Sequence, residues 1–252
     1  MSAVDTDTIG LRRIEWVRFT IFGIPIHIRF SFWIVAAIIF PFQLTVLSRS
    51  ESWPFLAAWL VVVAVSVIAH ELGHALTARR FGAQVDMTLY ALGGFTRWAT
   101  SQPIGPWRRV LVAAAGSTVG FVLGGLVLLA LRAGVVPDEP RVVAFALESF
   151  WQVNILWGVL NWLPVRPLDG GHIFLGVMQA LLGRNGERIA DVVFPVVTIA
   201  GGLFALSRGY LFAAVLAGFV LMEEVRRWSS QRRPARPSQP EPEAPFTLFG
   251  DD

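Results

Sequence analysis

The chain lacks cysteine and lysine and contains only four histidines among its 252 residues. Without cysteine it can form no disulfide, and a zinc site would have to use histidine and carboxylate ligands. Charged residues are also scarce, at 15% of the chain, whereas soluble domains carry about 25%. Hydrophobic residues make up 54%. We therefore expect most of the chain to face lipid or other membrane helices.

Six apolar stretches predict membrane-spanning helices, which need roughly 20 residues each. They cover about 28–47, 54–80, 109–131, 142–163, 188–206 and 209–226. A shorter apolar stretch, 172–182, predicts a helix packed inside the bundle. Residues 26–30 alternate like a strand, and 85–98 predict a strand pair around Gly93-Gly94. The predicted fold class is an all-α polytopic membrane protein with about six transmembrane helices and a small membrane-associated β-sheet.

The arginines indicate how the chain crosses the membrane. Four of the 21, namely Arg49, Arg132, Arg141 and Arg208, fall on one side of the predicted spans, and the other seventeen fall on the opposite side. By the positive-inside rule both termini are cytoplasmic, which also accounts for the pI near 10.4. We expect a multi-pass protein of the plasma membrane with a cytoplasmic N-terminal arm (1–25), a transmembrane domain (26–228) and a disordered cytoplasmic tail (229–252).

The second predicted span contains the motif His70-Glu71-Leu72-Gly73-His74. Two histidines four residues apart lie about 40° apart around a helix, so both can reach one zinc ion. Glu71 can then take a proton from a zinc-activated water. Ionisable groups inside a membrane indicate function by default. A pair of histidines that merely hydrogen-bond to another helix is the alternative interpretation.

A catalytic zinc usually takes a third protein ligand, for which Asp169 fits best. It follows the run from Asn161 to Leu168, where Pro164 and Pro167 end the fourth span. Asp169 would begin the 172–182 helix, whose positive end favours an ionised carboxylate. An ordinary N-cap aspartate is the alternative. His27 and His172 are weaker ligand candidates.

The third predicted span carries Gly116, Gly120 and Gly124 at four-residue spacing. Small residues repeated in this way let another helix approach closely. We interpret this face as a packing surface.

The two motifs together, His70 to His74 and Asn161 to Gly171, resemble the site-2 protease family of intramembrane zinc metalloproteases. The resemblance extends over roughly 20–185, and the chain looks like a minimal member without an appended PDZ or CBS domain. It implies that His70, His74 and Asp169 bind Zn²⁺, that Glu71 is the general base, and that Asn161 helps to hold the substrate or the oxyanion. The family's third span often carries Pro and Asn after the glycine, and this chain has neither after Gly116.

The resemblance implies that 26–228 is a metalloprotease domain that would perform regulated intramembrane proteolysis. The implied partners are the lipid bilayer, a single-span substrate such as an anti-sigma or pro-sigma factor, and a regulatory membrane protein, with no nucleic acid. One rival hypothesis is a catalytically silent membrane scaffold that contains zinc. Another is a metal transporter, although transporters usually place ion sites at the midplane between repeated halves.

Overall fold

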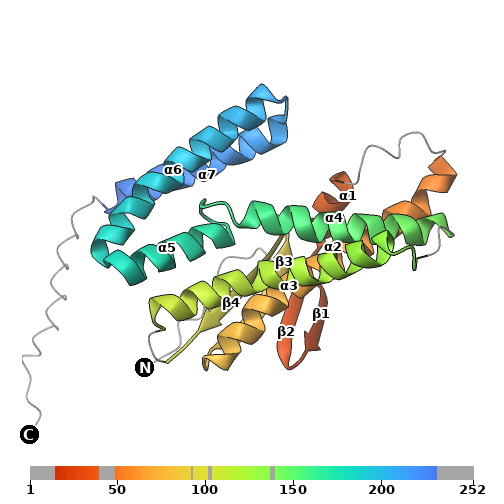
Figure 1. Ribbon diagram of the computed structural model, residues 1–252, viewed down its shortest axis with the longest axis horizontal. Coiled ribbons are helices and arrows are strands. Elements are labelled where there is room, and N and C mark those ends of the chain that lie inside the picture. Colours follow the sequence, from red (N-terminus) through yellow and green to blue (C-terminus); the bar gives the residue numbers. More distant parts are fainter. Residues whose placement is uncertain (1–14, 40–48, 92, 102–103, 137–139, 232–252) are drawn as a thin grey trace, which may run out of the picture. The chain divides into compact units, whose positions relative to one another are not determined.

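The computed structural model describes residues 15–39, 49–91, 93–101, 104–136 and 140–231. The chain divides into two units, Met1–Val197 and Thr198–Asp252. The helices are α1 (Phe30–Ile38), α2 (Arg49–Arg80), α3 (Pro106–Arg132), α4 (Arg141–Asn161), α5 (Asp169–Leu182), α6 (Arg184–Ser207) and α7 (Leu211–Gln231). The strands are β1 (Glu15–Ile21), β2 (Ile24–Arg29), β3 (Gln84–Tyr90) and β4 (Gly93–Ala99). Figure 1 shows these elements along the chain.

Four of the described helices are long and apolar enough to cross a membrane. They are Ser52–Arg80, Pro106–Arg132, Arg141–Asn161 and Arg184–Ser207. The six predicted spans are therefore not confirmed. The first one, 28–47, is described only as far as residue 39, where α1 has already ended. The last one corresponds to α7, which is a helix but is not among these four. The first three residues of the predicted disordered tail (229–252) belong to the end of α7, and the rest of the tail lies outside the described residues.

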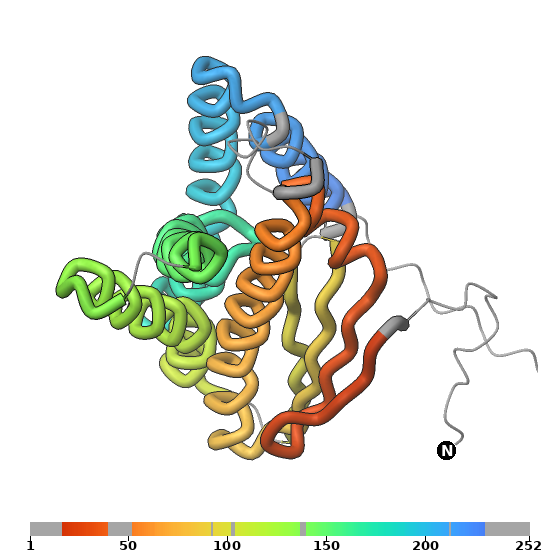
Figure 2. Tube along the Cα trace, turned by 90° about the vertical axis from the view of Figure 1, so that its right-hand side faces the viewer, coloured from red at the N-terminus to blue at the C-terminus, as the bar shows by residue number. Residues whose placement is uncertain are grey.

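The sheet has four strands in the order β1-β2-β3-β4 and is larger than the sequence predicts. The two outer pairs are antiparallel, while β2 and β3 are parallel. Figure 2 shows the strands side by side next to α2. Alternate residues of β2 and β3, among them Ile26 and Met87, are fully buried in a core that also includes Ala75 of α2. The inner face of the sheet therefore packs against the helix that carries the histidine motif.

The strand β1 lies within the range that we expected to form an N-terminal arm. It joins β2 through Phe22 and Gly23, whose φ values are 51° and 76°. Positive φ at both residues is typical of the tight two-residue turn of a β-hairpin. Phe22 is an unusual residue at such a position, so the sequence carries little sign of the turn.

The predicted packing surface on α3 is confirmed by its contacts. A Cβ added at Gly124 would lie 2.9 Å from Asn154 Cβ, so α4 approaches α3 closely there. The side chain of the same residue also reaches α2, where Asn154 Nδ2 donates a hydrogen bond of 2.8 Å to Ser66 Oγ. Asn154 therefore connects α4 to α2 by a buried hydrogen bond while its helix packs against α3.

In the second unit, the end of α6 packs closely against α7. A Cβ added at Gly202 would lie 3.0 Å from Ala217 Cβ. The turn between the two helices contains Gly209 at a φ of 78°, a conformation that favours glycine.

We predict that Asn154→Ala destabilises the protein, because it leaves the buried Ser66 hydroxyl without this partner. Interhelical hydrogen bonds in membranes contribute about 0.6 kcal/mol on average and up to about 1.7 kcal/mol. The measurement is denaturant unfolding of the protein in detergent micelles. Gln152→Ala is the matched control, because Gln152 is exposed on the same helix and donates its hydrogen bond to the exposed Glu148. Equal unfolding free energies for the two variants would contradict the prediction.

Candidate metal centre

The two histidines of the motif lie close together on α2, and each is about 8% exposed. Their Nε2 atoms are 3.1 Å apart. The other ring nitrogen of His74, Nδ1, is 2.7 Å from the carbonyl oxygen of Val112 on α3. A carbonyl oxygen can only accept, so His74 Nδ1 carries the proton. In the neutral ring the lone pair of His74 is therefore on Nε2, the atom that faces His70.

The structure brings Asp169 to the same point from the start of α5. Its Oδ2 is 3.1 Å from His70 Nε2, and its Oδ1 is 3.3 Å from His74 Nε2. The N-cap residue of α5 is Leu168, and no side chain caps this helix. Asp169 is therefore not an ordinary N-cap aspartate, and its carboxylate is directed to the two histidines at the positive end of the helix.

Gly170 and Gly171 let α5 begin directly against the loop that precedes it. A Cβ on Gly170 would lie 2.2 Å from the Trp162 carbonyl oxygen, and one on Gly171 would lie 2.7 Å from that of Val165. Both residues are helical, so glycine is needed here for close approach and not for a tight turn. The same loop is held by Arg166, whose Nη2 is 3.1 Å from Asp191 Oδ1 of α6.

The residues fit a tetrahedral metal ion. A zinc ion with bonds of about 2.05 Å holds its ligand atoms about 3.3 Å apart. The two histidine nitrogens are 3.1 Å apart, and they lie 3.1 and 3.3 Å from the two different oxygens of Asp169, which is near this spacing. Three groups that offer lone pairs repel one another unless a cation or protons lie between them. Two histidines and one carboxylate also form a donor set typical of zinc hydrolases. Within the described residues, this is the one group of His, Cys, Asp and Glu side chains with such spacing.

Glu71 lies beside this group and is held from the sheet. Thr96 Oγ1 of β4 donates a hydrogen bond of 2.7 Å to Glu71 Oε2. Gly94 makes room for the carboxylate, because a Cβ there would lie 2.5 Å from Glu71 Cγ. Burial and the nearby Glu71 charge raise the pKa of the Tyr90 phenol on β3 above its usual value. Tyr90 therefore stays protonated at neutral pH.

Asn161 lies at the end of α4 with its Nδ2 3.4 Å from His70 Nε2, so it borders the group. His172 lines the cleft but is not one of the three clustered side chains. His27 lies on β2, paired in register with Thr88, and is also outside this group.

The structure shows a contact from α3 to the candidate ligand Asp169 that the sequence did not indicate. Ser117 Oγ donates a hydrogen bond of 3.2 Å to Asp169 Oδ2, and Ser117 is fully buried. The only signal for Ser117 in the sequence was its position next to Gly116, on the small-residue face of the third predicted span. A hydroxyl beside a small-residue face is too common to have singled it out.

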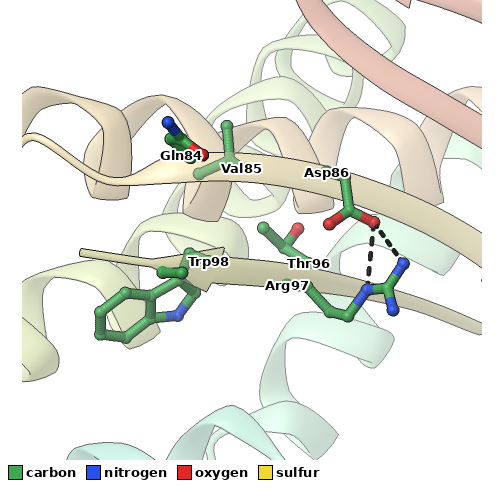
Figure 3. A pocket seen from close by; sticks show the side chains of 7 residues that line it. Gln84, Val85, Asp86, Thr96, Arg97 and Trp98 are labelled. Carbon is green, nitrogen blue, oxygen red and sulfur yellow. Dashed lines mark hydrogen bonds and ion pairs between the residues drawn. The ribbon is translucent and has the colours of Figure 1, made fainter. Parts of the chain in front are cut away.

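The group opens into a cleft of about 280 Å³, whose lining includes Glu71, His74 and Asp169. A second hollow lies along the β3–β4 ribbon, where Arg97 Nη2 pairs with Asp86 Oδ2 at 2.9 Å (Figure 3). Thr96 and Trp98 line both the cleft and this hollow. The outer surface of the ribbon and the candidate metal centre therefore meet at β4.

Close packing of α3 against α2 shapes the centre. A Cβ on Gly73 would lie 2.9 Å from Gly116 Cα, and one on Gly116 would lie 2.3 Å from His74 Nε2. Any side chain at Gly116 would thus displace a ligand atom of the candidate site.

We predict that Gly116→Ala lowers the metal content of the purified protein at least tenfold, because the added methyl group moves His74. Gly125→Ala is the matched control: it lies on the same helix and its Cβ would meet nothing within 4 Å. The measurement is metal per chain by atomic emission after dialysis. Normal metal content in Gly116→Ala would show that the close contact does not limit the site.

The fold and this side-chain group define the chain as a multi-pass membrane protein with a buried site that can hold a metal ion. Comparison with known proteins agrees with this class. Residues 58–153 match the model of peptidase family M50. The chain is 32% identical over 182 residues to "Putative zinc metalloprotease Rip3" of Mycobacterium tuberculosis, covering 67% of this chain and 44% of the relative. It is 26% identical over 166 residues to "Zinc metalloprotease MJ0392" of Methanocaldococcus jannaschii, covering 66% and 46%.

A solved structure, "Site-2 Protease from Methanocaldococcus jannaschii", has the same fold. The TM-score is 0.57 at 22% identity, and the match covers 88% of this chain and 98% of the other. The chain belongs to peptidase family M50, the site-2 protease family. It spans less than half the length of the curated relatives described above.

Proposed function

We propose that this chain is an intramembrane zinc metalloendopeptidase that cleaves transmembrane segments of membrane-tethered proteins. One observation carries the proposal: His70 and His74, on a helix that can cross a membrane, cluster with Asp169 of α5 and lie beside Glu71. A buried group of this kind within lipid is costly unless it has a function. Membership of family M50 and relatives named zinc metalloproteases support the same conclusion.

In this proposal His70, His74 and Asp169 hold the zinc ion. When bound, zinc supplies a Lewis acid that polarises the scissile carbonyl and acidifies water. Glu71 accepts the proton of the attacking water and later passes it to the leaving amine. Thr96 keeps the Glu71 carboxylate turned into the cleft through the 2.7 Å hydrogen bond. Asn161, whose side chain borders His70, holds the substrate backbone or the developing oxyanion.

The sheet provides a way to present an extended substrate. A transmembrane helix keeps its carbonyl groups in its own hydrogen bonds, so it must unwind before attack. In the described sheet β4 is an edge strand, and an extended peptide can add to such an edge through main-chain hydrogen bonds. Because Gly94 and Thr96 of β4 contact Glu71, a segment paired there would pass close to the cleft.

The cellular setting follows from the arginine distribution. We propose a multi-pass protein of the plasma membrane with both termini cytoplasmic and with 26–228 as its protease domain. His74 precedes Arg79 at the end of α2 by about 7.5 Å of helix rise, which places the site near the cytoplasmic surface. Single-span regulators such as anti-sigma or pro-sigma factors are the proposed substrates, under the control of a regulatory membrane partner.

We predict that Glu71→Gln abolishes cleavage while the protein keeps its metal, because the amide cannot accept the proton but no ligand is removed. Quantitative membrane proteomics of cells with wild type or Glu71→Gln should reveal one single-span protein, or its membrane-bound remnant, that accumulates only in the mutant. Glu148→Gln is the control, since Glu148 is an exposed residue of α4 that bonds to Gln152.

Two outcomes would count against the protease. If no protein accumulates although both variants are expressed and contain zinc, a catalytically silent scaffold explains the chain better. If the purified wild type binds no zinc, the proposed centre itself is wrong.

We also predict that Thr96→Val slows cleavage of the accumulating protein about tenfold, a fraction of the 10²–10⁴ that general acid–base catalysis contributes. Valine has the shape of threonine but cannot donate to Glu71, whereas Thr96→Ser keeps the hydroxyl and should cleave near the wild-type rate. Pulse-chase decay of the substrate gives the rates. A serine variant as slow as the valine variant would show that the hydrogen bond is not what matters.

A further inference from the structure

Helix α3 contacts two of the three clustered side chains through polar atoms. The Val112 carbonyl accepts the hydrogen bond from His74 Nδ1 at 2.7 Å. Five residues later, Ser117 Oγ donates to Asp169 Oδ2 at 3.2 Å. Between them, Gly116 lets the helix backbone lie against the His74 ring. This stretch of α3 is therefore a second layer around the candidate metal centre.

The structure assigns to Ser117 the role of a positioning residue that holds Asp169 in its metal-binding orientation. This inference rests on the proposed function, because it takes His70, His74 and Asp169 as the metal ligands. Ser117 itself is not one of the three clustered side chains. It acts through Asp169, whose carboxylate would otherwise rotate at the start of α5.

The hydrogen bond from Ser117 to a side chain of another helix is less common for a serine inside a helix than a bond to its own backbone. Serine and threonine inside helices commonly bond back to the carbonyl oxygen four residues earlier. The neighbouring Thr118 does so, with its Oγ1 donating to the Ala114 carbonyl oxygen at 2.8 Å. Ser117 instead reaches a side chain 52 residues away in sequence. Since Ser117 is fully buried, its hydroxyl needs a protein partner, and Asp169 is that partner.

The hydrogen bond from Ser117 also influences which oxygen of the Asp169 carboxylate faces each histidine. Oδ2 receives the Ser117 proton and lies 3.1 Å from His70 Nε2, while Oδ1 lies 3.3 Å from His74 Nε2. A donor on one oxygen fixes the rotation of the whole carboxylate plane and stabilises its ionised form. Groups that orient metal ligands in this way typically change metal affinity 10- to 100-fold when removed.

We predict that Ser117→Ala weakens zinc binding by the full-length protein about 10- to 100-fold. Affinity is measured in detergent micelles by competition with a chromogenic zinc chelator. The absorption spectrum of bound Co²⁺ should also change, since it reports on the ligand geometry around the metal. Thr118→Ala is the matched control, because Thr118 is exposed, adjacent and bonded within its own helix. It should bind zinc and Co²⁺ like the wild type.

A rescue variant separates positioning from a structural role. Ser117→Thr retains the hydroxyl and should bind zinc more tightly than Ser117→Ala, with a Co²⁺ spectrum like that of the wild type. Thermal unfolding of each apo-protein shows whether the bundle is intact. The inference is overturned if Ser117→Ala keeps wild-type affinity, or if Ser117→Thr is as weak as Ser117→Ala. The proposed function fails separately, and recognisably, if the wild type binds no zinc.

Discussion

The contact between α2 and α3 at Gly73 and Gly116 is the constraint on which the candidate site depends. A Cβ on either glycine would overlap atoms of the opposite helix. Without side chains in between, the backbone of α3 lies against the histidine motif. This closeness brings the Val112 carbonyl to His74 and the Ser117 hydroxyl to Asp169. In a membrane, small residues of this kind allow van der Waals packing where no hydrophobic effect drives the helices together.

The side chains of the candidate site are held by contacts from several elements. His74 is oriented by α3, Glu71 by β4 and Asp169 by α3, while Asn161 of α4 borders His70. Buried polar groups without partners are costly, and the cost is highest in a low-dielectric interior. The hydrogen bonds offset that cost and limit rotation of the same side chains. The small sheet and the helices thus cooperate in building one rigid site.

Local patterns in the sequence were enough to predict the main parts of this arrangement. Apolar length predicted α2, α3, α4 and α6, and the spacing of His70 and His74 predicted their convergence. Asp169 could be selected because two prolines end the helix before it. These features depend on residues near one another in the chain, which is why they could be recognised.

Features that depend on tertiary contacts could not be read from the sequence. The strand β1 was missed because its turn places Phe22 in a conformation that usually signals glycine. The need for glycine at Gly170, which lets a helix begin against the Trp162 carbonyl oxygen, likewise arises only from a contact made in the fold. The partners Ser117 and Thr96 are common hydroxyl residues whose roles arise only when distant segments meet.

The order of the site residues along the chain has a consequence for biosynthesis. His70, Glu71 and His74 enter the membrane with α2, but the residue that completes the group begins α5, after α3 and α4. During translation the histidine pair therefore exists for some time without its carboxylate partner and without the helix that orients it. A competent centre can form only when four later elements, β4, α3, α4 and the start of α5, have been made and packed. Until then the nascent chain has only two of the three side chains that could hold a metal ion.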